Sequence, residues 1–195
     1  MTHLIGQITD DAPLLVVAFE EEAKYLGTDH PMLITGVGKV NAAISLTQAL
    51  ASSGSKPSLI VNVGTAGGLR DGDNQSGLHV VSEVIQHDLD TGLLESLTGE
   101  IYGAPITLSD RDGVTLATGD TFVSDSAVRE KLAQRATLVD MEGYAVAAAA
   151  GAFGIPIRMV KHVSDSADES ATSTWRSALE HSARQLADWV HANIG

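Results

Sequence analysis

Acidic side chains follow short apolar runs at three places that lie far apart in the sequence. The run Leu14–Phe19 is followed by three glutamates, of which the last is Glu22. Glu142 comes after a second apolar run, and Asp165 comes after a third. Carboxyl groups in such places can act as general acids or bases, or accept hydrogen bonds from sugar hydroxyls. Each has a structural alternative, because acids also stabilise helix N-termini and cap turns.

Two glycine-rich segments, Thr35–Asn41 and Asn62–Arg70, also follow predicted strands and are interpreted as turns. Glycine allows a positive φ and a close approach of the backbone to a ligand, so such turns can form the floor of a site. Val40 follows Lys39 where a nucleotide-triphosphate loop needs Ser or Thr, which excludes that motif. Taken alone, both segments are better explained as tight turns between packed elements.

Covalent and metal-dependent chemistries have little support in the sequence. There is no cysteine, so thiolate nucleophiles, disulfides and zinc ribbons are excluded. The seven histidines are scattered without the HExxH spacing of a zinc enzyme, and no GxSxG motif is present. We therefore expect neither a metal nor an organic cofactor.

The bulk composition limits the possible partners. The 195 residues carry a formal net charge of −13, which argues against nucleic acid or an anionic membrane surface. No apolar run approaches the ~20 residues that cross a bilayer. The first residues show neither a basic leader nor a long apolar core, so we expect a cytoplasmic protein without a secretory signal. The length fits one domain over residues 1–195.

Strand-like and helix-like segments alternate, which predicts an α/β domain around a largely parallel or mixed sheet. One helix is expected from Gly38 to Gly54 and another after Ser124, and an amphipathic helix begins near Trp175. The first helix is expected to place Val40, Ala43, Ile44, Thr47 and Leu50 on one apolar face. The predicted strands are Leu14–Phe19, Met32–Val37, Leu59–Val63, Leu78–Ile85, Val114–Ala117, Thr137–Val139 and Ile155–Val163.

Six sequence blocks occur in an order that resembles the purine nucleoside phosphorylase superfamily. They are AFEEE, TGVGKVNAA, NVGTAGGL, TGDTFV, VDMEGYAVA and VSDSAD, and the resemblance extends from Leu14 to about Trp189. Within that superfamily the blocks are most similar to those of the 5′-methylthioadenosine/S-adenosylhomocysteine nucleosidases. The resemblance implies a single α/β domain with a mixed, partly barrel-like central sheet flanked by helices.

The resemblance also implies roles for individual residues. Glu22 would activate a water molecule, Glu142 would bind the ribose hydroxyls, and Asp165 would protonate the departing purine at N7. Glu20 and Glu21 would be acids of a helix start or of the surface. The remaining binding positions would be Met141 against the sugar, Ser164 beside the acid, Phe122 stacked on the base, Val123 at the base edge, Ala66 and Gly67 in the floor, Val37 on the sugar side and Trp175 near the 5′ substituent.

Hydrolysis is favoured over phosphorolysis at this stage. Phosphorylases of the superfamily typically carry an arginine for phosphate at the position that is Asn62 here, and the segment after the first strand is acidic. The expected reaction is hydrolysis of a purine nucleoside, most closely 5′-methylthioadenosine or S-adenosylhomocysteine. The resemblance also implies a homodimer in which the partner helps close the 5′ end of the pocket.

Three alternatives remain open. The substrate could be another purine nucleoside such as adenosine, inosine or aminodeoxyfutalosine, the enzyme could be a phosphorylase, or the chain could bind nucleosides without turnover. Residues 85–114 match the family poorly, and Lys161 stands where an arginine is common. The base and the 5′ group are therefore less well determined than the reaction class.

Overall fold

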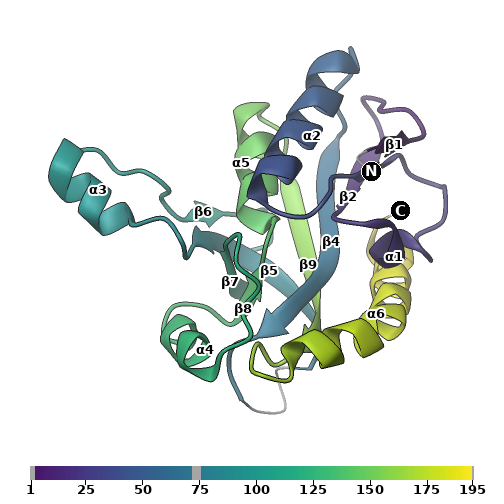
Figure 1. The fold of residues 1–195 in the computed structure, drawn as a ribbon. Coiled ribbons are helices and arrows are strands. Elements are labelled where there is room, and N and C mark those ends of the chain that lie inside the picture. The colour runs from purple at the N-terminus through teal and green to yellow at the C-terminus, as the bar shows by residue number, and fades with distance from the viewer. Residues whose placement is uncertain (1–2, 72–75, 195) are drawn as a thin grey trace.

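The computed structural model describes residues 3–71 and 76–194 (Figure 1). Strands and helices alternate along the chain, as the sequence predicts. The strands are β1 His3–Ile5, β2 Pro13–Val17, β3 Met32–Ile34, β4 Leu59–Gly68, β5 Gly77–Gln86, β6 Ile106–Thr107, β7 Val114–Thr118, β8 Leu138–Asp140 and β9 Ile157–Asp165. The helices are α1 Glu20–Ala23, α2 Lys39–Ser52, α3 Thr91–Thr98, α4 Ser126–Ala133, α5 Gly143–Ala152 and α6 Ala171–Asn193.

The strands form one mixed sheet that closes on itself in its centre. The order is β1-β3-β2-β4-β8-β7-β5-β6, and β9 pairs with both β4 and β5. Strands β4, β8, β7, β5 and β9 therefore make a closed ring. The β4–β9 pair is parallel, whereas β4–β8 and β5–β9 are antiparallel. The predicted mixed, partly barrel-like α/β fold is confirmed.

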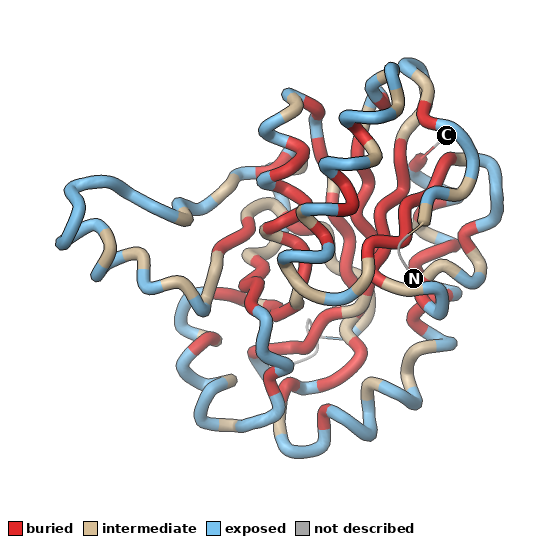
Figure 2. The backbone as a smooth tube through the Cα atoms, turned by 45° about the horizontal axis from the view of Figure 1, so that its top comes forward, coloured by how far each residue is buried: buried red, intermediate tan, exposed pale blue. Residues whose placement is uncertain are grey.

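Helices cover both faces of the sheet, which explains why its central strands are apolar throughout. Leu14 and Val16 of β2 pack in the core that includes α2 and α5, whereas Leu15 and Val17 pack with α6. Successive side chains of a strand point to opposite faces, so a strand covered on both sides needs an unbroken apolar run. Figure 2 shows these central strands as almost continuously buried.

Helix α2 buries only part of the predicted face, since Leu50 is in the core but most of that face is exposed. Val40 and Ile44 are 65% and 52% exposed, whereas Ala42 and Leu46 are fully buried. Ala42 and Leu46 share a core with the alanine-rich helix α5, whose small side chains let the two helices approach closely. The prediction for Val40 and Ile44 is therefore wrong, and these two side chains form an exposed apolar strip.

The second glycine-rich segment is a strand and not a turn. Its residues up to Gly68 are the second half of β4, where the backbone pairs with β9 through Gly67. A Cβ atom on Gly67 would lie 3.1 Å from the side chains of Asp165, Val139 and Ala167. The glycine therefore permits close side-chain packing within the ring. The first segment is a turn as predicted, with φ of 81° at Gly36 and 94° at Gly38.

Helix α3 lies within residues 85–114. Asp90 caps it by accepting a hydrogen bond from the backbone N–H of Leu93, and none of its residues is buried. Figure 1 shows α3 standing away from the body, joined to it by β5 and β6. Among the residues that the structure describes, no helix is long and apolar enough to cross a membrane.

Candidate active site

A cavity lies where several strands end, and it encloses about 830 Å³ of empty space including its open mouth. The predicted site residues, although scattered through the sequence, all line this one cavity. They are Val37, Glu22, Ala66, Gly67, Phe122, Val123, Met141, Glu142, Ser164, Asp165 and Trp175.

Glu22 is the buried member of the three-glutamate run. Glu20 and Glu21 are exposed, whereas Glu22 is only 2% exposed and its side chain reaches from α1 to Thr65 of β4. Its Oε1 accepts hydrogen bonds from the backbone N–H and the hydroxyl of Thr65, at 2.6 and 2.8 Å. Oε2 is buried and accepts no hydrogen bond from the described residues.

The electrostatic surroundings of Glu22 act in opposite directions. Burial raises the pKa of its carboxyl above the ordinary value, and the nearby Lys161 and the hydrogen bonds from Thr65 lower it in part. A Cβ atom on Gly64 would lie 3.2 Å from both carboxylate oxygens and 3.4 Å from Lys161 Nζ. The missing side chain at Gly64 therefore allows the carboxylate and the ammonium group to share this part of the cavity.

Asp165 lies at the end of β9, next to a break in strand register. Gly67 pairs with Asp165 although Ala66 pairs with Val163, so Ser164 is the extra residue of a bulge. A bulge re-aims side chains, and here both Ser164 and Asp165 line the cavity. Asp165 Oδ1 accepts from the N–H of Ala167 at 2.9 Å, and Oδ2 accepts from the Ser164 hydroxyl at 2.8 Å. Burial raises the pKa of Asp165 despite these two bonds.

Glu142 is the residue before the first turn of α5. Its Oε1 accepts a hydrogen bond from the backbone N–H of Gly38 at 2.8 Å, so it joins α5 to the start of α2. Burial, together with the negative charge of Asp140, raises the pKa of Glu142 to about 8. In the empty cavity at neutral pH this carboxyl group is therefore largely protonated.

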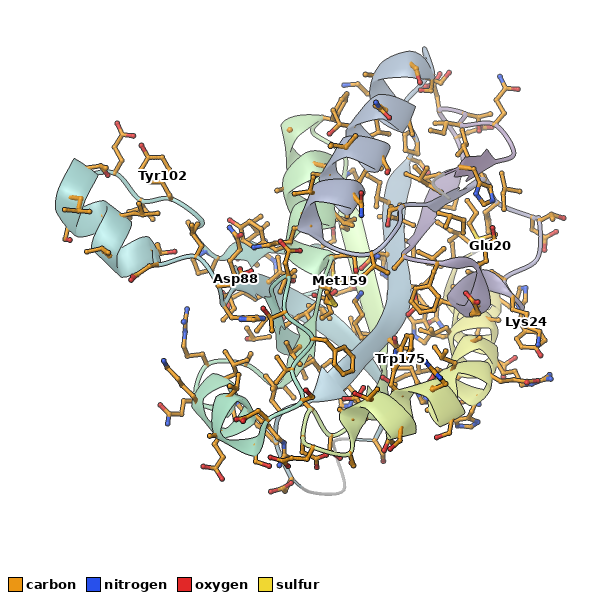
Figure 3. All side chains as sticks on the ribbon, viewed as in Figure 1. Glu20, Lys24, Asp88, Tyr102, Met159 and Trp175 are labelled. Atoms are coloured by element: carbon orange, nitrogen blue, oxygen red, sulfur yellow. The ribbon has the colours of Figure 1, made fainter. Side chains whose placement is uncertain are left out.

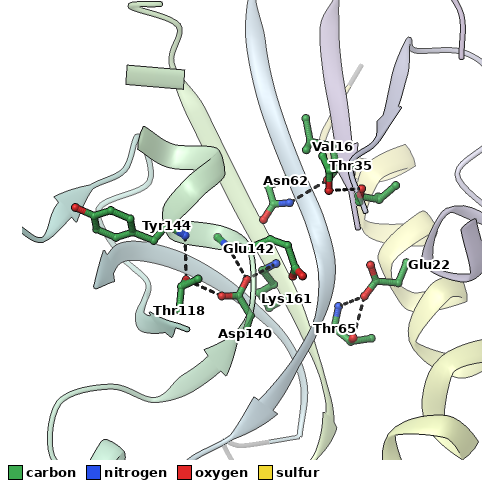
Figure 4. A network of polar contacts seen from close by, with 12 residues as sticks. Val16, Glu22, Thr35, Asn62, Thr65, Thr118, Asp140, Glu142, Tyr144 and Lys161 are labelled. Carbon is green, nitrogen blue, oxygen red and sulfur yellow. Dashed lines mark hydrogen bonds and ion pairs between the residues drawn. The ribbon is translucent and has the colours of Figure 1, made fainter. Parts of the chain in front are cut away.

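A buried ion pair between β9 and β8 is part of the lining of the same cavity (Figure 4). Lys161 Nζ lies 2.9 Å from Asp140 Oδ2, and the two side chains are 2% and 1% exposed. Asp140 also accepts hydrogen bonds from the Thr118 hydroxyl at 2.6 Å and the Gly143 N–H at 2.8 Å. Burial lowers the pKa of Lys161, but Asp140, Glu142 and Glu22 together raise it above the ordinary value, so it stays charged.

Three aromatic rings form one wall of the cavity. Trp175 makes edge-on contacts with Phe19 and Phe122, with ring centroids 5.7 and 6.3 Å apart. Its indole N–H donates to the Thr65 hydroxyl at 3.2 Å. Figure 3 shows Trp175 in the first part of α6, on the side of the helix that faces the sheet. Phe122 is 40% exposed, so this wall reaches the mouth of the cavity.

Several residues of the cavity had no predicted role. Phe19, Thr65 and Asp140 line it together with Lys161 and Asn62. Phe19, Thr65 and Asp140 lie inside the six sequence blocks named above. Their closeness in sequence to predicted site residues is the one signal that could have identified them as lining residues. No residues in the described part of the chain form a group of three or more His, Cys, Asp or Glu side chains that could hold a metal ion.

The closed ring of strands and the cavity of buried carboxyl groups define an α/β protein with a small-molecule site. The family comparison agrees with this class: the model described as the phosphorylase superfamily matches residues 22–194. The chain belongs to that superfamily.

Two curated relatives are 5′-methylthioadenosine/S-adenosylhomocysteine nucleosidases. The chain is 29% identical over 214 residues to the protein of Actinobacillus succinogenes, covering 96% of this chain and 90% of the relative. It is 31% identical over 182 residues to that of Bacillus subtilis, covering 82% and 78%.

Two solved structures from Helicobacter pylori have the same fold. A futalosine hydrolase mutant matches with a TM-score of 0.81 and 23% identity, covering 93% of this chain and 97% of that one. A 5′-methylthioadenosine/S-adenosylhomocysteine nucleosidase with a bound immucillin matches with a TM-score of 0.79 and 21% identity, covering 95% and 98%.

Proposed function

We propose that this protein hydrolyses the N-glycosidic bond of a purine nucleoside. The observation that supports this most strongly is the meeting of Glu22, Glu142 and Asp165 in one cavity, each buried and each with a raised pKa. Carboxyl groups with perturbed pKa values in a shared cavity are typical of acid–base catalysis. The superfamily membership and the curated nucleosidase relatives support the same reaction.

Each carboxyl group has a defined task in the proposed mechanism. Breaking the bond between C1′ and the purine builds positive charge on the ribose and leaves the bonding electrons on the base. Asp165 gives its proton to N7 of the base, and Glu22 takes a proton from the water whose oxygen forms the new bond to C1′. Glu142 accepts hydrogen bonds from the ribose hydroxyls. The reaction leaves Asp165 ionised and Glu22 protonated, and exchange with solvent restores both.

Water, and not phosphate, is the proposed nucleophile. Asn62 occupies the position of the phosphate-binding arginine, and its amide donates to the carbonyl of Val16 at 3.0 Å. Lys161 is the single cation among the described lining residues, and it is paired with Asp140. A phosphate dianion would therefore meet carboxylates without a free cation, whereas water would meet the base Glu22.

The proposed substrates are 5′-methylthioadenosine and S-adenosylhomocysteine, and the product is adenine. The names of the curated relatives support these substrates. The likeness in fold to a futalosine hydrolase makes a purine nucleoside with a different 5′ group the second candidate. The aromatic wall of Phe19, Phe122 and Trp175 provides apolar surface for a 5′ substituent in either case.

We also propose that the protein is a cytoplasmic homodimer. Besides Val128 on α4, the described large apolar side chains that are 45–71% exposed gather on two segments, α2 with the turn before it and the region of α3. They are Val37, Val40, Ile44, Leu93, Leu97, Ile101 and Tyr102. Figure 3 shows Tyr102 on the projecting α3 region, away from the body. Light scattering should give twice the mass of the chain, and a paired Ile44→Lys and Leu97→Lys variant should give the monomer.

A base-release assay tests the proposed reaction directly. Methylthioadenosine, adenosylhomocysteine, adenosine, inosine and aminodeoxyfutalosine are supplied with and without phosphate. Release of free base and free sugar without phosphate supports hydrolysis, whereas release that requires phosphate identifies a phosphorylase. Saturable binding without base release from any of the five would contradict the proposed activity and identify a nucleoside-binding protein.

A further inference from the structure

Trp175 connects the aromatic wall of the cavity to the carboxylate of Glu22 through a single hydroxyl group. Its indole Nε1 lies 3.2 Å from Thr65 Oγ1, and this oxygen lies 2.8 Å from Glu22 Oε1. An indole N–H can only donate, and an ionised carboxylate can only accept. The Thr65 hydroxyl must therefore accept from Trp175, and its one hydrogen points at Glu22.

The two oxygens of Glu22 are consequently not equivalent. Oε1 receives both the hydroxyl and the backbone N–H of Thr65, the latter at 2.6 Å. Oε2 is fully buried, lacks a hydrogen-bond partner among the described residues, and belongs to a residue that lines the cavity. Hydrogen bonds to one oxygen fix the plane of the carboxylate, so Oε2 is the atom left to take a proton.

We propose that Trp175 and Thr65 are positioning residues that hold Glu22 so that its Oε2 faces the attacking water. This rests on the proposed hydrolytic function and adds a role for Trp175 besides contact with the substrate. Thr65 supplies the two donors to Oε1, and the indole N–H fixes the direction of the hydroxyl hydrogen. Trp175 also contacts Phe19 and Phe122. A ligand that lies on the aromatic wall therefore restrains the indole ring of Trp175, and through it the carboxylate of Glu22.

Loss of this arrangement has a defined effect on the protonation of Glu22. The charged groups that act on its carboxyl are Lys161 of β9 and, around that lysine, Asp140 of β8 and Glu142 at the start of α5. On β4 the contribution is the pair of hydrogen bonds from Thr65, which favour the ionised form. A weaker hydroxyl bond therefore raises the pKa of Glu22 and moves the acidic limb of the kcat/KM profile to higher pH.

The kinetic test compares the two tryptophans of α6. Trp175→Phe keeps an aromatic ring but removes the N–H, and we expect kcat to fall about 3- to 10-fold, with a smaller change in KM. The acidic limb should move to higher pH. The matched control is Trp189→Phe, since Trp189 packs against Arg158 away from the cavity. It should leave kcat, KM and the pH profile unchanged.

A double-variant comparison tests whether Trp175 acts through Thr65. Thr65→Val removes the hydroxyl, and Thr65→Ser keeps it. Trp175→Phe should lower kcat in the wild-type and Thr65→Ser backgrounds but add little to Thr65→Val. An equal loss in all three backgrounds, or a rise in KM with kcat and the pH profile unchanged, would overturn the proposal and leave Trp175 as a substrate contact alone.

A measurement without turnover separates this proposal from the proposed function. The sequence has two tryptophans, so Trp189→Phe leaves Trp175 as the only indole. Its N–H resonance in a ¹H–¹⁵N spectrum should shift with pH as Glu22 titrates, and Glu22→Gln should abolish that shift. A resonance that does not titrate, or that titrates equally in Glu22→Gln, contradicts the positioning of Glu22 by Trp175 and Thr65, even if the enzyme hydrolyses nucleosides. A resonance that titrates, in a protein that releases no purine from any nucleoside, supports the positioning of Glu22 and contradicts the proposed hydrolysis.

Discussion

Lys161 Nζ and Asp140 Oδ2 are 2.9 Å apart in the lining of a cavity that three further carboxyl groups also line. Both side chains are almost completely buried, and Asp140 has two additional hydrogen-bond donors. Such a pair is stable only when both charges are present, because either one alone would be left uncompensated in the interior. The pair therefore sets the electrostatic background for Glu22 and Glu142.

Replacing the lysine should destabilise the protein strongly. Lys161→Met leaves Asp140 and its acidic neighbours without a cation, and loss of one partner of a buried pair typically costs about 3–5 kcal/mol. Thermal unfolding should show a large drop in Tm, at about 2–4 °C per kcal/mol for a chain of this size. The double variant Lys161→Met with Asp140→Asn should recover part of the loss. A double variant that is less stable than the single one would argue against an uncompensated charge as the cause.

The raised pKa of Glu142 should make the stability of the empty protein depend on pH. Its pKa rises from 4.5 to about 8 on folding, so between these values the folded state binds more protons than the unfolded state. The free energy of unfolding must then fall as pH rises through this range. Glu142→Gln is neutral at every pH and should lack this part of the decline.

Melting temperatures from pH 5 to pH 8 check this effect. The wild-type Tm should decrease relative to that of Glu142→Gln as pH rises, by about 2–4 °C for each kcal/mol of linkage. Glu130→Gln, which changes an exposed glutamate on α4, is the matched control and should follow the wild type. Parallel curves for wild type and Glu142→Gln would show that Glu142 keeps an ordinary pKa in the folded protein.

A methyl group at position 64 should disturb catalysis more than folding. Its Cβ would lie 3.2 Å from both oxygens of Glu22, closer than ordinary contact, so the carboxylate would have to move. A misplaced catalytic group can cost about 10²-fold in rate, so we expect Gly64→Ala to lower kcat by up to that factor. Gly151→Ala on α5 is the control, because a Cβ there meets no atom within 4 Å. Equal activity of the two variants would contradict a tight site at Gly64.

The sequence predicted most of the architecture because apolar runs and helix patterns are local signals. All seven predicted strands have counterparts, but β4 continues through a segment that resembles a glycine-rich turn. A glycine-rich sequence fits a turn, but it also fits a strand such as β4, in which Gly67 leaves space for the side chains of Asp165 and Val139. The buried face of α2 was predicted only in part: Leu50 is in the core as predicted, but Ala42 is buried because α5 supplies small side chains opposite it.

For the candidate site, the residues that line the cavity were predictable from the sequence, but the contacts between them were not. Order and type of the motifs were enough to predict residues that line one cavity, including Glu22, Glu142 and Asp165. The contacts that tune them were not predictable, because they join distant parts of the chain. Trp175 meets Thr65 across 110 positions. Lys161 of β9 meets Asp140 of β8 although these two strands do not pair with each other, since each pairs with β4.

The most direct test of the central claim is the turnover of Asp165→Asn on methylthioadenosine or the preferred nucleoside, measured together with its binding. Asparagine keeps the size of the side chain but cannot give a proton to N7, and general acid catalysis typically contributes about 10²–10⁴ in rate. We predict a loss of kcat in that range while the Kd for the nucleoside changes little. Asp188→Asn, an exposed substitution on α6, should leave kcat unchanged. An Asp165→Asn enzyme with the kcat of the wild type would contradict the account.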